Sequence, residues 1–158
     1  MYNRAGILKA GRKVVRGVQI TFWRVCGWIF FGALYGGLEI LWRGHTHWTM
    51  ALLGGLLFVL IGAINEYIPW CIPLWRQGVI GALIVTWAEL VAGLVLNVWL
   101  RLGIWDYSYL PGNFMGQICP QFTAVWVLLS IAAVVLDDWL RHWLFGEDRP
   151  HYKIWRCT

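Results

Sequence analysis

Four long apolar stretches alternate with more polar segments along this chain. The apolar stretches cover about residues 25–42, 48–65, 78–100 and 121–139. Each approaches the roughly 20 residues that an α-helix needs to cross the hydrocarbon core of a bilayer. The connecting segment 66–77 contains two prolines, and segment 101–120 contains both prolines and glycines, which discourage a continuing helix. The pattern predicts an all-α integral membrane protein with four transmembrane helices in a single membrane domain.

Residues 1–22 form a basic segment that precedes the first apolar stretch. On a helical projection, Ile7, Val14 and Val18 fall on one side, and Lys9 and Arg16 fall on the opposite side. This arrangement is typical of an amphipathic helix that lies in the anionic membrane interface. We therefore expect anionic lipid to bind this basic amphipathic N-terminal helix. The alternative is an irregular, solvated basic tail.

The composition supports lipid as the solvent of this chain. Hydrophobic residues make up 59% of the 158 residues and charged residues only 13%. A soluble domain this small places most of its residues near water and could not cover so much apolar surface. The 13 tryptophans also favour a membrane, because Trp concentrates where hydrocarbon meets headgroups.

The distribution of basic residues predicts the orientation. Ten of the 13 lysines and arginines lie before the first or after the last apolar stretch, namely Arg4, Lys9, Arg12, Lys13, Arg16, Arg24, Arg141, Arg149, Lys153 and Arg156. Positive charge accumulates on the cytoplasmic side of membrane proteins. We expect an N-in/C-in, multi-pass protein of the cytoplasmic membrane, with 101–120 as an outer loop and 144–158 as a cytoplasmic tail. This distribution does not indicate nucleic-acid binding.

Glu89 is the polar residue that most needs an explanation, because it lies near the middle of the third apolar stretch. A carboxylate in hydrocarbon costs several kcal/mol on insertion scales, which is about the cost of a few lost hydrogen bonds. Thr86, Gly93 and Asn97 follow helical spacing from Glu89 and predict a polar, small-residue stripe that faces the protein interior. The sequence favours a functional carboxylate, which binds a proton or a cation or acts as a catalytic acid or base; a structural carboxylate bonded to a neighbouring helix is the alternative.

Other charged residues near the ends of the apolar stretches favour structural roles. Glu39 lies four residues before Arg43 and predicts an i,i+4 ion pair. Asp137 and Asp138 oppose the dipole of the fourth helix near its C-terminus, and we expect Arg141 to compensate them.

His45 and His47 are weak candidates for a metal site. Two histidines in a turn can reach one metal ion, but no third ligand follows from their spacing. Histidines that bond backbone or lipid headgroups at the interface are the favoured interpretation.

The segment from Glu89 through the third connection carries a family resemblance. Glu89, Gly93 and Asn97 lead into Trp105-Asp106-Tyr107-Ser108, and Asn113 precedes Gly116-Gln117-Ile118-Cys119. This series resembles the CmpB-like family of small bacterial membrane proteins, described as putative ABC-transporter type IV. The resemblance is strongest over residues 89–126 and looser over 39–65.

The resemblance implies a binding region shared by the third helix and the outer loop. It singles out Glu89, Asn97, Asp106, Tyr107, Ser108, Asn113 and Gln117. The alternative is a re-entrant cap that its own hydrogen bonds hold together. The chain has no GxxxxGK[ST] phosphate loop, so an ATP-driven pump would take its energy from a separate subunit.

Three functions remain open from the sequence. The first is a transporter or channel component that moves a small solute or ion past Glu89 and Asn97. The second is a membrane enzyme at the outer leaflet that uses Asp106, His45 and His47. The third is a non-catalytic subunit of a larger complex. No nucleophile-and-base pair is recognisable, so the sequence favours a non-enzyme. It predicts no cofactor, and either a homo-oligomer or a separate partner subunit.

Overall fold

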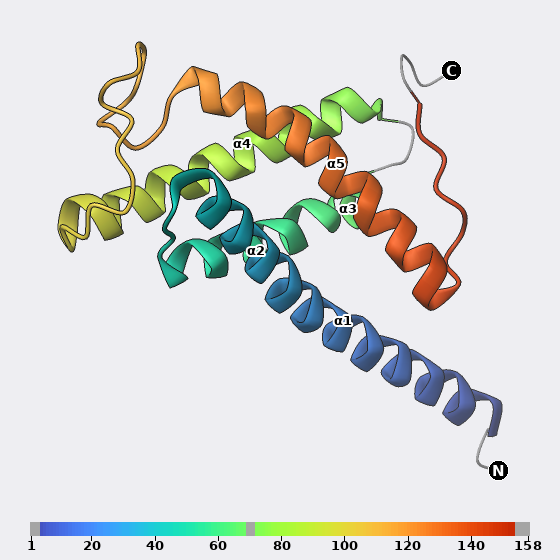
Figure 1. The fold of residues 1–158 in the computed structure, drawn as a ribbon. Helices are drawn as coiled ribbons and strands as arrows, with labels where there is room; N and C mark the ends of the chain where they lie inside the picture. Colours follow the sequence, from blue (N-terminus) through green and yellow to red (C-terminus); the bar gives the residue numbers. More distant parts are fainter. Residues whose placement is uncertain (1–3, 69–71, 154–158) are drawn as a thin grey trace. The chain divides into compact units, whose positions relative to one another are not determined.

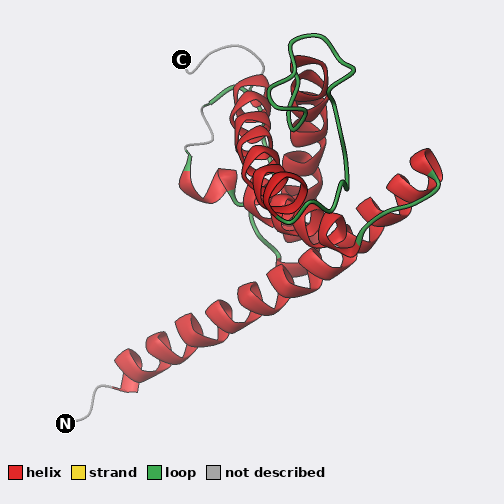
Figure 2. Cartoon of the chain, turned by 90° about the vertical axis from the view of Figure 1, so that its left-hand side faces the viewer, coloured by secondary structure: helices red, strands yellow, loops and turns green. Residues whose placement is uncertain are grey.

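The computed structural model describes residues 4–68 and 72–153, with the backbone alone for 4–21, 23 and 66. All regular secondary structure in this part of the chain is helical, without strands, and loops connect the helices (Figure 2). The helices are α1 (Arg4–Arg43), α2 (Trp48–Gly62), α3 (Ile64–Tyr67), α4 (Leu74–Gly93), η1 (Leu94–Trp99) and α5 (Pro120–Phe145) (Figure 1). The all-α prediction is confirmed for the described residues.

Three of these helices meet the length and apolar composition of membrane spans. They are Arg24–Arg43 within α1, Leu74–Trp99 across α4 and η1, and Pro120–Phe145. The second predicted span corresponds to α2, which has 15 residues and is followed at Ala63 by the short α3. At 1.5 Å per residue, α2 covers about 22 Å, less than a hydrocarbon core of about 30 Å. The prediction of four spans is therefore not confirmed.

The helix ends differ from the predicted ends. Pro73 precedes α4, which begins at Leu74 rather than at Gly78. Helix α5 continues beyond Trp139 to Phe145, where Gly146 adopts a left-handed conformation (φ 64°) and donates to the carbonyl of His142. The backbone of α1 is a single helix that includes most of the predicted interfacial segment; the side chains that would form its amphipathic face lie outside the described residues.

Residues 1–59 form one compact unit, unit 1, in which α1 packs against α2. The approach of the two helices depends on glycine: a Cβ on Gly32 would lie 2.4 Å from the carbonyl oxygen of Ala51. The rings of Phe31 and Phe58 stack at 3.5 Å between centroids. Small residues at such crossings let two membrane helices pack backbone against backbone.

Residues 60–158 form a second compact unit, unit 2, which is built on the antiparallel pair α4 and α5. The connection between η1 and α5 folds as a compact loop, the loop 101–119, at one end of this pair (Figures 1 and 2). At the other end, α3 contacts α5.

Polarity in unit 2 is arranged as expected for a protein in lipid. Large apolar side chains such as Leu83, Trp87 and Leu128 are more than 60% exposed on the helix surfaces. Several polar side chains are buried instead, and these include Gln77, Glu89, Ser130, Asp137 and Asp138. Buried polar groups need partners inside the protein, so hydrogen bonding between polar side chains in unit 2 concentrates in its interior.

Candidate functional site

Glu89 lies on the face of α4 that packs against α5. Its side chain is buried, with 4% exposure, and its Oε2 accepts a hydrogen bond from the indole Nε1 of Trp126 at 2.8 Å. One helical turn earlier, the hydroxyls of Thr86 and Thr123 bond each other at 3.1 Å. Glu89 and Thr86 therefore face α5, as the predicted polar stripe requires.

Asn97, in η1, fastens the loop to the helix. Its Nδ2 donates to the carbonyl of Trp105 at 3.0 Å and to Oε1 of Gln117 at 2.9 Å, and its Oδ1 accepts from the backbone N–H of Ile104 at 2.7 Å. The buried Trp105 indole donates to the carbonyl of Gln117 at 3.1 Å. Asn97 thus bonds to residues near both the beginning and the end of the loop.

The π-helical winding of η1 explains how Asn97 is phased with Glu89. In a regular α-helix, eight residues would leave Asn97 about 80° away from Glu89 around the axis. A π-helix has i→i+5 bonds and turns less per residue, so η1 rotates Asn97 back toward the α5-facing side. Gly93 completes this face: a Cβ there would lie 2.4 Å from Oε1 of Gln117.

The tip of the loop is held by its own polar side chains. Oδ1 of Asp106 accepts hydrogen bonds from the backbone N–H and the hydroxyl of Ser108. Asn113 donates to the carbonyls of Ser108 and Leu110, and its Oδ1 accepts from the N–H of Gly116. These contacts are those of a self-contained cap, which was one of the two interpretations of this loop.

Tyr107 connects the loop tip to α5 through its ring. The ring stacks on Phe122 at 4.7 Å between centroids. Its backbone N–H donates to the carbonyl of Gly116 at 2.8 Å. This stacking holds the N-terminal end of α5 against the loop.

Asp106 makes the loop tip sensitive to acid. The hydrogen bonds from the Ser108 hydroxyl and N–H hold the pKa of Asp106 below its ordinary value. Because the pKa of Asp106 is lower in the folded chain than in the unfolded chain, its ionised form stabilises the fold at pH values above the unfolded pKa of about 4. This stabilisation is lost as the pH falls through the folded pKa. We therefore expect the loop tip to be intact at neutral pH and to loosen only below about pH 4.

An NMR titration of the Ser108 amide proton measures this effect. The shift of this proton should titrate with a midpoint below the ordinary Asp value in the native chain and should lose that titration in Asp106→Asn. Asp148→Asn is the matched control and should leave it unchanged. A midpoint at or above the ordinary value contradicts the expectation.

A second polar cluster, the Asp137–Asp138 cluster, lies at the opposite end of unit 2. Oδ2 of Asp138 accepts from Asn65 Nδ2 at 2.6 Å and from the Tyr152 hydroxyl at 2.9 Å. Burial and the nearby Asp138 raise the pKa of Tyr152, so its phenol remains a donor. Asp137 pairs with Arg141 at 3.6 Å, which confirms the predicted compensation.

The contribution of Arg141 extends to the following segment. Its guanidinium also binds Glu147 at 3.2 Å, just past the end of α5. A cation that neutralises acidic groups at the C-terminal end of a helix also favours the helix dipole. This explains why α5 continues through two aspartates.

In unit 1 the charged residues form local contacts. Glu39 makes the predicted ion pair with Arg43 at 2.8 Å and also accepts from the Thr46 hydroxyl. Nδ1 of His47 lies 2.8 Å from the Thr49 hydroxyl, and His45 is exposed. Within the described residues, no three His, Cys, Asp or Glu side chains gather as a metal site would require.

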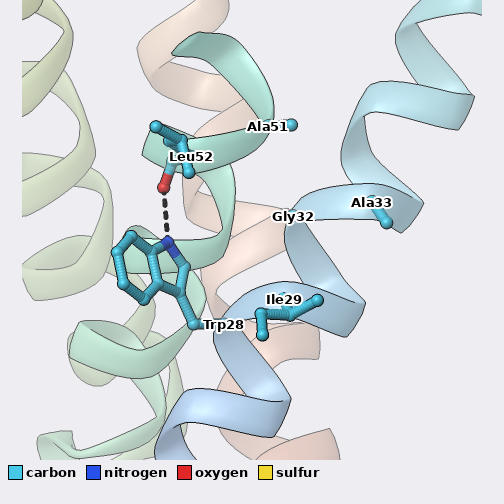
Figure 3. A pocket seen from close by; sticks show the side chains of 6 residues that line it. All are labelled: Trp28, Ile29, Gly32, Ala33, Ala51 and Leu52. Atoms are coloured by element: carbon cyan, nitrogen blue, oxygen red, sulfur yellow. Dashed lines mark hydrogen bonds between the residues drawn. The ribbon is translucent and has the colours of Figure 1, made fainter. Parts of the chain in front are cut away.

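Unit 1 also contains an apolar pocket of about 240 Å³ between α1 and α2 (Figure 3). Trp28, Ile29, Gly32, Ala33, Ala51 and Leu52 line it. The Trp28 indole donates to the carbonyl of Leu52 at 2.8 Å, which satisfies its N–H within unit 1. The pocket has no charged lining residue and offers no polar chemistry.

The residues that the sequence singled out therefore separate into groups. Glu89 is paired with Trp126; Asn97 and Gln117 bond each other; and Asp106, Ser108 and Asn113 share the loop tip with Tyr107. Sequence reasoning missed Trp126 and Asn65 as partners of carboxylates. An antiparallel pairing of the third and fourth helices would have placed Trp126 opposite Glu89, but the register between helices cannot be read from one sequence.

Comparison with known proteins identifies a family. A family model with the description "Putative ABC-transporter type IV" matches residues 37–147, more than two thirds of the chain. The matched range includes Glu89, the loop and both aspartates of α5. No curated protein and no solved structure matches the chain.

Proposed function

We propose that this protein, which belongs to the CmpB-like family of type IV ABC-transporter-like membrane proteins, is a membrane component of a transport system and moves a small solute or ion past Glu89. The family and the apolar helices make the chain a transport-related membrane protein. The proposal adds the carboxylate that carries the transported species or the coupled proton.

The burial of Glu89 between two membrane-spanning helices carries this proposal. Its side chain is 4% exposed, and no cation among the described residues forms an ion pair with it. The hydrogen bond from the Trp126 indole stabilises an ionised Glu89 by about 1.5–3 kcal/mol. This is less than the free-energy cost of placing an ionised carboxylate in hydrocarbon. Glu89 must then be protonated or bind a cation, and these are the two states that a transport site alternates between.

The loop residues support this proposal more than the enzyme alternative. Asp106 would be a reactive group in an enzyme at the outer leaflet, but its Oδ1 is occupied by both donors of Ser108. Asn97 and Gln117 are likewise engaged with loop backbone. In this proposal the loop is a closed cover over the end of the α4–α5 pair.

The remaining features of the proposal concern the environment of the protein. The basic residues at both ends of the sequence support a place in the cytoplasmic membrane, with both ends inside and the N-terminal segment on anionic lipid. So few membrane helices enclose little by themselves, and we therefore propose a homo-oligomer or a complex with a separate, energy-providing subunit.

Flux through sealed proteoliposomes tests the role of Glu89. The native chain and Glu89→Gln are compared across a panel of small solutes and ions, after thermal unfolding has shown that both fold. We expect Glu89→Gln to lower the flux about a hundredfold, because the amide cannot take up or release a proton. Trp126→Phe, which removes the indole donor and part of the ring but keeps the Glu89 carboxyl group, is expected to cause a smaller loss.

Glu39→Gln is the matched control because it makes the same chemical change in another apolar helix. It should leave the flux close to that of the native chain. If Glu89→Gln transports as well as the native chain, Glu89 is not the site. If neither protein moves any member of the panel, stand-alone transport is excluded, and a non-catalytic subunit becomes the better description.

A further inference from the structure

The buried polar groups between α4 and α5 are arranged unequally on the two sides of Glu89. Toward the loop, Asn97 and Gln117 make hydrogen bonds with each other and with loop backbone. Among the described residues, the buried side-chain oxygens without a hydrogen-bond partner are Asn65 Oδ1, Gln77 Oε1 and Ser130 Oγ. All of these lie on the side of Glu89 away from the loop.

Ser130 and Gln77 are both buried, each with 1% exposure, and Gly78, the residue after Gln77, packs against Ile131 of α5. Ser130 packs against Gly81, where a Cβ would lie 2.7 Å from its Oγ. Gln77 is one helical turn before Gly81 on α4, and Ser130 is one turn after Trp126 on α5. The two unpaired oxygens therefore lie between the Glu89–Trp126 contact and the Asp137–Asp138 cluster.

Unpaired oxygens in such a place require a partner. Each buried polar group left without a hydrogen bond costs about 1–3 kcal/mol, and proteins usually supply a side chain or an ordered water. Polar groups that lead through a membrane helix pair to carboxylates are typical of proton pathways. On the loop side, the buried Trp105 and the close packing of Gln117 on Gly93 leave no comparable unpaired group among the described residues.

We propose that Glu89 exchanges its proton with the Asp137–Asp138 end of unit 2, through a hydrogen-bonded path formed by Ser130, Gln77 and water, and not through the loop. This inference rests on the proposed role of Glu89. At each step one O–H bond breaks and another forms, so a proton that leaves the Glu89 carboxyl group passes to water and then to an Asp carboxylate or bulk water. Asp137 and Asp138 lie at least seven residues beyond Ser130, about 10 Å along the helix, so water molecules must carry the proton over this distance, positioned by hydrogen bonds to the amide oxygen of Gln77.

The groups around the receiving end can take part in such an exchange. Asp138 accepts from Asn65 and Tyr152, while Arg141 balances Asp137 and Glu147. A proton that reaches this end therefore meets two different carboxylates. Asp138 is hydrogen-bonded to neutral donors, and Asp137 is paired with the cation of Arg141. The proposed function assigns no role in transport to the Asp137–Asp138 cluster, and the exit of protons from the protein is such a role.

Infrared spectroscopy of the full chain in lipid nanodiscs follows this exchange without knowledge of a substrate. The C=O stretching band of the protonated Glu89 carboxyl group is identified at about pH 5 as the band that Glu89→Gln lacks. Its rate of hydrogen–deuterium exchange in D₂O is then compared among the native chain, Ser130→Ala and Gln77→Leu. We expect both variants to slow the exchange about tenfold or more. Gln121→Leu is the matched control, because Gln121 is an exposed glutamine at the loop end of α5, and it should exchange like the native chain.

The outcomes separate this inference from the proposed function. If Ser130→Ala and Gln77→Leu exchange as fast as the native chain, the path is wrong while Glu89 remains a proton-exchanging site. If Gln121→Leu alone slows the exchange, the proton enters from the loop and the inference is overturned. If the native chain shows no Glu89 band down to about pH 4, both this inference and a proton-linked role of Glu89 fail. Thermal unfolding of each variant shows that the fold is retained.

Discussion

Asn97→Ala is expected to release the loop 101–119 from the helix pair and to destabilise unit 2 by about 2–4 kcal/mol. The substitution removes hydrogen bonds to Ile104, Trp105 and Gln117 at once. It also leaves the buried Gln117 amide oxygen without this donor. The effect is large because one side chain connects the beginning and the end of the loop.

Thermal unfolding and amide hydrogen exchange of the loop measure this effect. The backbone amides from Ile104 to Gln117 should exchange faster in Asn97→Ala, whereas those in the middle of α5 should change much less. Gln121→Ala is the control, since the exposed Gln121 makes one side-chain bond to the Pro111 carbonyl and should cost less than about 1 kcal/mol. Equal effects of the two substitutions would show that Asn97 is not the fastening point.

Gly55→Ala is expected to disrupt unit 1 by about 3 kcal/mol or more. A Cβ at this position would lie 2.2 Å from the Trp28 carbonyl oxygen and 2.4 Å from Cδ1 of its ring. A backbone oxygen cannot move aside as a flexible side chain can, so α1 and α2 would have to separate.

Gly37→Ala provides the matched control on α1, because a Cβ there meets no atom within 4 Å. It should leave stability unchanged or raise it by about 1 kcal/mol through helix propensity. Unfolding in lipid or mild detergent, followed by circular dichroism, compares the two variants. If Gly55→Ala is as stable as Gly37→Ala, the close crossing of α1 and α2 is not required.

The sequence predicted where helices occur better than where they end. Apolar helices long enough to cross a membrane lie where the third and fourth spans were predicted, because long apolar stretches form helices in lipid. The fourth predicted span ends at Trp139, whereas helix α5 continues six residues further, to Phe145. Charged residues end the apolar part of a helix but not the helix itself, and Arg141 neutralises Asp137 within the same helix.

The candidate site shows a similar division. The part of the stripe formed by Thr86, Glu89 and Gly93 could be predicted because it depends on the period of one α-helix, whereas the position of Asn97 also depends on the π-helical winding of η1. The contact with Trp126 depends on how two helices are aligned, which no local pattern specifies. The mutual bonding of Asp106, Ser108 and Asn113 was open from the sequence, because the same residue types build a closed turn or a binding site.

The π-helical segment η1 has a consequence for the length of the chain. A π-helix can be regarded as an α-helix that has absorbed one extra residue without breaking. Deleting one residue from Leu94–Trp99 would therefore shorten the chain while preserving a continuous helix, but would turn the anchor of the loop away from α5. The gain or loss of a single codon in this helix can thus change how the loop is anchored. The change acts through the helical winding and leaves every residue of the loop as it is.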